Sequence, residues 1–181
     1  MKHHTYSVSV KWTGNDGEGT ARYDSYRRDH AITSPERTPI LGSSDPAFRG
    51  DGRRWNPEQL LVASLAQCHM LWYLHLCADA AIVVVSYEDQ AEGILAEHSA
   101  GGHFTQVTLK PRVVVASGGR LETAERLHQT ASERCFIRSS VNFPVEHDAR
   151  RGAGQVESVL RVADGARAGH GRVRDVAMKD Q

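Results

Sequence analysis

The longest hydrophobic segment of the chain runs over residues 56–79, NPEQLLVASLAQCHMLWYLHLCAD. It opens with Asn56, a residue type that caps helix N-termini, followed by Pro57, which suits the first helical position, and by Gln59 three residues after the cap. No Gly or Pro interrupts the run that follows. The pattern predicts one helix over 56–79, roughly 34 Å long at about 1.5 Å per residue.

This predicted helix is apolar on nearly every side, which is typical either of a membrane span or of a helix at the centre of a core. From Leu60 to Ala78 its strongly polar side chains are Ser64, Gln67, His69 and His75, and no aromatic belt flanks it. Two histidines and a glutamine within the apolar run favour the core. We therefore predict a buried central helix and no membrane partner.

Strands are predicted where apolar and polar residues alternate or where β-branched residues gather. These segments are residues 5–12, 21–28, 82–88, 91–97, 104–115 and 141–147. The segment 91–97 is the expected partner of 82–88, and Pro111 indicates a bulge or an edge within 104–115. A long loop is predicted over 33–55, where three prolines and three glycines gather.

A second, amphipathic helix is predicted over residues 121–134, because Leu121, Ala124, Leu127 and Ala131 recur at spacings of three and four. The resulting order is strands, long helix, strands, helix, strand. That order indicates an α+β fold rather than a regular βαβ series.

Composition changes after residue 148, where arginine and glycine become frequent. We predict one domain over 1–148 and a polar C-terminal tail over 149–181, with a short helix or strand possible only at 156–163. The 181 residues hold 22 basic and 22 acidic side chains, so no nucleic-acid partner is expected. No secretory signal is recognised at the N-terminus, and we expect a cytoplasmic protein.

The chain has three cysteines, Cys68, Cys77 and Cys135, which form no CxxC motif and suit neither a disulfide scaffold nor a zinc ribbon. In a reducing compartment such thiols are inert core residues, or one or two of them are redox-active. Cys68 shares a helix face with Leu61, Leu65, Trp72 and His75.

A reactive thiol needs a nearby cation, a helix N-terminus or a histidine. The candidate cations lie in two groups, Arg27 and Arg28 in one and Arg49, Arg53 and Arg54 in the other. Glu58 could hold such an arginine in a bidentate pair, or it could simply be a favourable charge at the positive end of the helix dipole.

Histidine and cysteine together also raise the question of zinc. Cys68 and His69 are adjacent in the sequence and point about 100° apart on a helix. They are poorly placed to share one ion, so no metal site and no cofactor are predicted. His69 is expected to be hydrogen-bonded in the core or at a subunit interface.

Two segments together resemble one protein family: NPEQLLVASLAQCHMLWYLHLC and, about seventy residues later, ERCFIRSSVNFPVEH. They are similar to the osmotically inducible and organic hydroperoxide resistance proteins, the OsmC/Ohr family. The resemblance covers about residues 5–148. The letters CHM, with SSDPAFRGD before the helix, place the chain in an OsmC-like subgroup.

The resemblance implies a thiol-dependent peroxidase that reduces organic hydroperoxides. Cys68 matches the family's peroxidatic cysteine, Cys135 matches the resolving cysteine that forms a disulfide with it, and Glu58 matches a glutamate that orients an arginine. The family's arginine follows a GG turn that here reads TGNDGEGT, with no arginine, so Arg28 or Arg49 would serve. Phe136 also stands where the family often has proline.

The family fold consists of antiparallel sheets wrapped around the long central helix in an intertwined homodimer, with each active site built from both subunits. The same resemblance implies reduction by a dithiol of the lipoyl or thioredoxin type. Apolar residues near Cys68 are expected to bind the alkyl or aryl part of the substrate. These residues are Met70, Trp72, His75 and Phe136.

The missing arginine keeps a second hypothesis open. A dimeric OsmC-like protein could retain the scaffold and the thiols but hold a small molecule in its apolar pocket, with little or no turnover.

Overall fold

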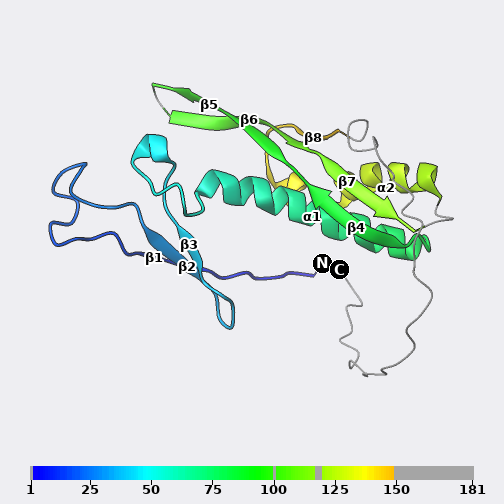
Figure 1. The fold of residues 1–181 in the computed structure, drawn as a ribbon, viewed down its shortest axis with the longest axis horizontal. Coiled ribbons are helices and arrows are strands. Elements are labelled where there is room, and N and C mark those ends of the chain that lie inside the picture. The colour runs from blue at the N-terminus through cyan, green and yellow to red at the C-terminus, as the bar shows by residue number, and fades with distance from the viewer. Residues whose placement is uncertain (1, 100, 117–119, 149–181) are drawn as a thin grey trace.

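The computed structural model describes residues 2–99, 101–116 and 120–148. Its elements follow one another along the chain as shown in Figure 1. They are β1 (Ser9–Trp12), β2 (His30–Thr33), β3 (Ile40–Gly42), the 3-10 helix η1 (Pro46–Phe48), α1 (Pro57–Asp79), β4 (Val84–Asp89), β5 (Glu92–His98), β6 (Gly101–Leu109), β7 (Pro111–Val115), α2 (Leu121–Arg134), the 3-10 helix η2 (Arg138–Ser140) and β8 (Val145–His147). The predicted α+β class is confirmed. The predicted tail, 149–181, lies outside the described residues.

Both helix predictions are confirmed. At the start of α1 the Asn56 side chain accepts a hydrogen bond from the Gln59 backbone N–H at 2.7 Å, and the Gln59 side chain accepts one from the Asn56 N–H at 3.3 Å. This reciprocal capping box satisfies two of the backbone donors that every helix start leaves unpaired. The second helix, α2, has the predicted bounds, and Cys135 caps its C-terminus.

The predicted strand over 21–28 is wrong. Residues 14–28 instead form an irregular excursion, closed by one isolated bridge between Asn15 and Tyr26. The strand that pairs with β1 is β2, in which His30 lies opposite Trp12. The Asn15 side chain accepts hydrogen bonds from two glycine N–H groups within this excursion. Local side-chain hydrogen bonding of this kind replaces a strand ladder. The predicted loop over 33–55 also contains β3 and η1.

The predicted strand over 104–115 is two strands in different sheets. β6 pairs with β5, whereas β7 pairs with β4, so the predicted pairing of 82–88 with 91–97 is also wrong. The switch occurs at Lys110, whose N–H donates to the Asp89 side chain at 2.7 Å instead of to a ladder. Pro111, which has no N–H to donate, begins β7 at this point. One pair in the fold, β6 with β8, is parallel, and the others are antiparallel.

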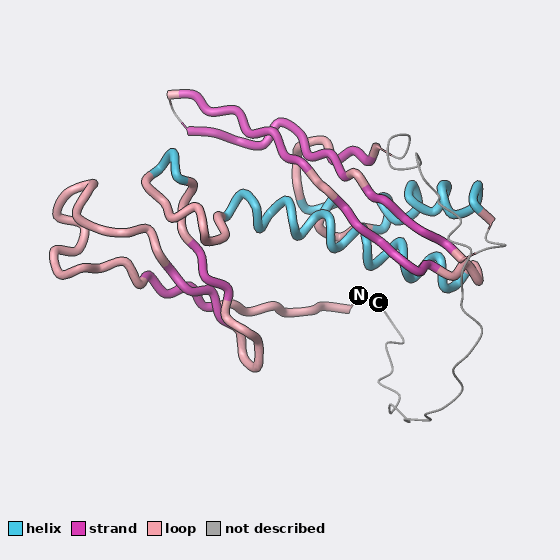
Figure 2. Tube along the Cα trace, in the orientation of Figure 1, coloured by secondary structure: helices cyan, strands magenta, loops and turns pink. Residues whose placement is uncertain are grey.

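The core lies on two sides of α1 (Figures 1 and 2). The C-terminal half of α1 packs with α2, β4 and β7 around Tyr73, Leu76 and Cys77. The N-terminal half packs on β6 and β8 around Leu65 and Val107. The strands β4–β7 therefore cover one side of the helix while α2 lies along another.

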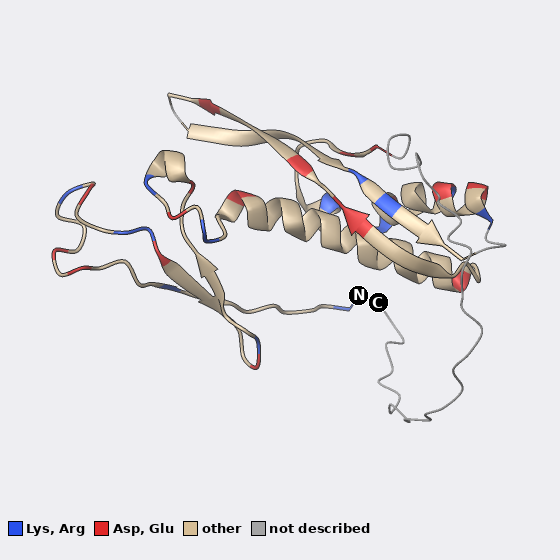
Figure 3. Cartoon of the chain, viewed as in Figure 1, with Lys and Arg blue, Asp and Glu red and all other residues tan. Residues whose placement is uncertain are grey.

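Much of α1 is nevertheless left uncovered by its own chain. The helix is long and apolar enough to cross a membrane by length and composition, with mean hydropathy 1.4, yet only 28% of that apolar window is buried. Its charged residues lie at the two ends, Glu58 and Asp79, and the length between them is uncharged (Figure 3). A helix of this kind requires more covering than one chain supplies.

Candidate active site

Two thiols from the two helices meet beside the core. Cys68 lies in the middle of α1 and is half-buried, whereas Cys135, at the C-terminal cap of α2, is 2% exposed. The two thiols are close enough for Cys68 to raise the pKa of Cys135, and both are free thiols. The sequence places these residues 67 positions apart, and the packing of α2 along α1 brings them together. The third cysteine, Cys77, is buried two and a half turns further along α1.

The two thiols have different environments. Burial and, after it, the neighbouring Cys68 thiol raise the pKa of Cys135 to about 11, against a lowering by the Arg138 backbone N–H that donates to Cys135 Sγ at 3.4 Å. Cys135 also lies at the negative end of the α2 dipole, which disfavours a thiolate. Cys135 is thus held as a thiol at neutral pH, and Cys68 is the more accessible of the pair.

A cluster of aromatic side chains, here called the aromatic rim, lies beside the thiol pair. Trp72, one turn after Cys68, contacts His75 edge-on at 5.8 Å between ring centroids and Phe136 edge-on at 5.7 Å. The Arg134 guanidinium lies over the same indole ring, 5.8 Å from its centroid. Three of the four residues predicted to bind substrate therefore gather on one side of α1.

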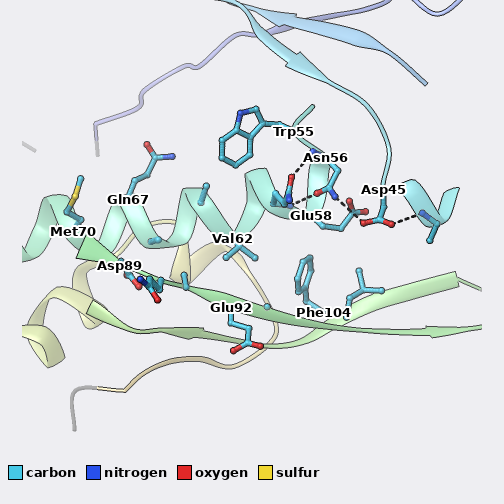
Figure 4. A pocket seen from close by; sticks show the side chains of 18 of the residues that line it. Asp45, Trp55, Asn56, Glu58, Val62, Gln67, Met70, Asp89, Glu92 and Phe104 are labelled. Atoms are coloured by element: carbon cyan, nitrogen blue, oxygen red, sulfur yellow. Dashed lines mark hydrogen bonds between the residues drawn. The ribbon is translucent and has the colours of Figure 1, made fainter. Parts of the chain in front are cut away.

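The fourth predicted substrate-binding residue, Met70, lies on another face of α1. It lines a cavity of about 930 Å³ between the helix and strands β4 and β5 (Figure 4). Apolar side chains such as Trp55, Val62 and Phe104 form much of the wall. The described residues that line it include no lysine or arginine, although Lys110 forms an ion pair with one of its carboxylates, Glu92. Five carboxylates line it: Asp45, Glu58, Asp89, Glu92 and Glu97.

Glu58 belongs to this cavity and not to the thiol pair. One of its carboxylate oxygens, Oε2, is buried without a hydrogen-bond partner among the described residues. Glu58 and Cys68 are ten positions apart on one helix, a rise of about 15 Å. Within one chain, Glu58 is too far along the helix to act on the Cys68 sulfur directly.

The two predicted arginines also lie away from the thiols. The Arg28 guanidinium stacks on the rings of Tyr23 and Tyr26, at 4.3 and 4.1 Å, and donates to the carbonyl oxygens of both residues. Arg49, in the left-handed backbone conformation after η1, lines a second cavity together with Arg28. The residues that line this cavity all lie between Asp16 and Gly50. They belong to the N-terminal lobe, residues 9–50, whose ribbon lies near the start of α1 (Figure 1).

Comparison with known proteins identifies the scaffold. The family described as OsmC-like protein matches residues 50–150. An OsmC-like protein of unknown function from Vibrio cholerae has 33% sequence identity, with 81% of this chain and 99% of that chain covered and a TM-score of 0.73. This chain belongs to the OsmC-like family.

More distant OsmC-fold structures have the same architecture. An organic hydroperoxide resistance protein OsmC from Legionella pneumophila has 20% identity over 80% of this chain and 97% of that chain, with a TM-score of 0.58. An organic hydroperoxide resistance protein from Elizabethkingia anophelis has 17% identity over 81% and 96%, also with a TM-score of 0.58. These two show the fold alone. No match was found among curated proteins.

This OsmC-like chain also contains a buried imidazole cluster that the sequence patterns did not predict. His69 Nε2 lies 3.0 Å from His128 Nδ1, and the ring of His147 is 5.7 Å from that of His69. The His128 ring stacks on Tyr73 at 3.9 Å. His69 is thus hydrogen-bonded in the core, and His128 could have been found because it falls on the apolar stripe of α2, seven residues after Leu121.

Desolvation keeps this cluster neutral. Burial, with a smaller contribution from His147, lowers the pKa of His69 to about 4. Burial and the two neighbouring imidazoles lower the pKa of His128 to about 3, and burial lowers that of His147. A small crevice is lined by His69, His147 and Cys135, so the cluster lies next to the buried thiol of the pair.

Proposed function

We propose that this OsmC-like protein is a thiol-dependent peroxidase that reduces organic hydroperoxides to alcohols. The observation that carries the proposal is the pair of neighbouring free thiols, one half-exposed and one buried. A disulfide requires Cα atoms within about 7 Å, and two thiols close enough to shift the pKa of one of them are compatible with that approach. The family resemblance and the names of the Legionella and Elizabethkingia neighbours support the same activity.

In the first step the Cys68 thiolate attacks the outer oxygen of the hydroperoxide. The O–O bond breaks, the alkoxide takes a proton and leaves as the alcohol, and Cys68 becomes a sulfenic acid. In the second step Cys135 attacks that sulfur, the S–O bond breaks, and the proton from Cys135 leaves with the hydroxide as water. A dithiol of the lipoyl or thioredoxin type then reduces the disulfide by exchange.

The aromatic rim favours a substrate with an apolar body. Trp72 and Phe136 lie beside Cys68, and Phe136 is 60% exposed and free to contact a ligand. Cumene hydroperoxide should therefore react faster than hydrogen peroxide.

The proposed chemistry predicts a stoichiometry. One equivalent of tert-butyl hydroperoxide added to the reduced protein should remove two of the three thiols, because Cys68 and Cys135 are oxidised together and the buried Cys77 is not. Titration of free thiols under denaturing conditions measures this, with peptide mapping to identify the disulfide. Retention of all three thiols would contradict the proposal.

We further propose that the protein is an obligate homodimer. All four residues of β1 are exposed, and so are large apolar side chains on several elements. They include Tyr6, Val8, Val10, Leu41, Leu71, Val83 and Val85. Apolar surface on an N-terminal sheet and on a central helix is what a second copy would cover. A partner's N-terminal lobe would also be the means of bringing Arg28 or Arg49 to Glu58.

The dimer has its own test. Leu71, in the middle of α1, is 59% exposed within one chain. Light scattering of the unmodified protein should give twice the chain mass at micromolar concentration, and Leu71→Glu should weaken that association and destabilise the fold by placing a charge in the interface. A stable folded monomer of the unmodified protein would exclude an obligate dimer.

The large cavity favours one alternative, a small-molecule-binding protein with little turnover. Its volume, about 930 Å³, and its apolar walls suit a ligand, and its carboxylates indicate a cationic one. Under this alternative the thiol titration shows no loss, and an apolar amine added to the protein raises its melting temperature.

A further inference from the structure

The thiol pair lies where the fold itself does not stabilise a thiolate. Cys68 is in the middle of a helix, away from its positive N-terminal end, and its partner Cys135 lies at the negative C-terminal end of α2. A cationic side chain is therefore needed if Cys68 is to ionise near neutral pH. Arg28 and Arg49 lie together in the N-terminal lobe, away from both sulfurs.

Arg134 is the cation that the fold places at the pair. It is the last residue of α2 and directly precedes Cys135. Its guanidinium lies over the ring of Trp72, one helical turn after Cys68, and so turns toward α1 rather than into solvent. Within the described part of the chain no carboxylate forms an ion pair with it, so its charge is not neutralised.

Arginines that lie near carboxylates differ in this respect. Arg27 is paired with Asp16 at 2.9 Å and Asp29 at 2.7 Å, and Arg54 lies 3.6 Å from both Asp29 and Asp51. Carboxylates within the N-terminal lobe therefore neutralise the charges of these two arginines. An unpaired guanidinium stacked on an indole retains its full positive charge for nearby groups.

Two other cations lie close to the thiols, and each is already engaged elsewhere. Arg138 faces the crevice behind Cys135, where its charge lowers the pKa of His147. His75, on the rim, lies 3.4 Å from the carboxylate of Asp79, which offsets any charge that it takes up. Among these described cations, Arg134 is the one that lies beside Trp72, directly before Cys135, without such an engagement.

We propose that Arg134 is the positioning residue that stabilises the Cys68 thiolate in this chain, acting across the face of Trp72. This deepens the proposed peroxidase function and rests on it for its biological use. The electrostatic effect on Cys68 does not depend on turnover and can be measured separately. A simpler role for Arg134, a favourable charge at the end of α2, would leave the ionisation of Cys68 unchanged.

The test is the pH dependence of Cys68 alkylation in the full-length reduced protein. Iodoacetamide, which is uncharged, is added between pH 5 and 10, and modification of Cys68 is followed by peptide mass spectrometry. Arg134→Met should move the midpoint upward by about half to one pH unit and slow alkylation at pH 7 about three- to tenfold. Arg134→Lys keeps the charge and should retain most of the unmodified rate.

Arg126→Met is the matched control. Arg126 is an exposed arginine of the same helix, paired with Glu122 at 3.6 Å, and its loss should leave the alkylation profile unchanged. Equal profiles for Arg134→Met and the unmodified protein would overturn the proposal, as would slowing by Arg28→Met or Arg49→Met alone. If the unmodified protein consumes no hydroperoxide, the peroxidase function fails while the alkylation profiles still decide the role of Arg134.

Discussion

Cys68→Ser is expected to abolish peroxide reduction, lowering the rate by roughly a thousandfold or more, because a serine hydroxyl is not ionised at neutral pH and forms no sulfenic acid. Cys135→Ser is expected to behave differently. Cys68 should still react once with a hydroperoxide, but its sulfenic acid then has no resolving thiol and accumulates. Steady-state turnover with a dithiol would fall, while the first reaction would proceed.

Two measurements separate these outcomes. Consumption of cumene hydroperoxide with dihydrolipoamide as reductant reports turnover, and dimedone labelling followed by mass spectrometry reports sulfenic acid on Cys68. Cys77→Ser is the control, since Cys77 is buried beside Tyr73 and away from the pair. Dimedone labelling of Cys135 in place of Cys68 would reverse the assigned roles, and full activity in Cys68→Ser would exclude the mechanism.

The helices were predictable because their signals are local. The capping box at Asn56 fixes the start of α1, and the apolar stripe of α2 together with charges on its other face fixes 121–134. The strands were less predictable, because pairing depends on contacts far apart in the chain. The break between β6 and β7 at Lys110 depends on the Asp89 side chain, 21 residues away in the sequence. The local alternation of apolar and polar residues continues across Lys110 and therefore predicts one strand.

The residues of the candidate site were likewise predictable only in part. Family resemblance paired Cys68 with Cys135, which spacing alone could not do, and the packing of α2 on α1 brings the two thiols close together. The position of Arg28 depends on the course of the N-terminal excursion and that of Arg49 on the end of η1, and the sequence has no periodic signal for either. Arg134 went unrecognised because a basic residue in the last turn of a helix is ordinary.

The arrangement also separates two chemistries on α1. The face that carries Cys68 and Trp72 meets α2 and holds the thiols, with a cation at its edge. Another face, with Glu58 and Met70, lines the carboxylate-rich cavity. An intertwined dimer would place a partner's surface against one or both. The unpartnered Glu58 oxygen marks the cavity as the place where a partner's cation would be most stabilising.

The buried imidazoles should make the protein sensitive to mild acid. The folded-state pKa values of His69 and His128, about 4 and about 3, lie below the ordinary value of 6.5. Between the folded and the ordinary pKa values the unfolded chain binds more protons than the folded one. The free energy of unfolding therefore has its full value above about pH 6.5 and decreases as the pH falls. At pH 5 each imidazole should lower the free energy of unfolding by about 2 kcal/mol.

Urea unfolding at pH 7.5, 6 and 5 measures this loss. His128→Gln removes one titrating group while an amide can still hydrogen-bond to His69, so the loss between pH 7.5 and 5 should fall by roughly a third to a half, because His69 and His147 still titrate. His75→Gln, at an exposed histidine, should leave the pH dependence unchanged. Half-buried Asp89 acts in the opposite direction, because burial raises its pKa and protonation on acidification relieves the cost of its charge. The histidine effect should dominate above pH 5, since several imidazoles whose pKa the fold lowers titrate there in the unfolded chain. Equal slopes for His128→Gln and the unmodified protein would show that the cluster does not control acid stability.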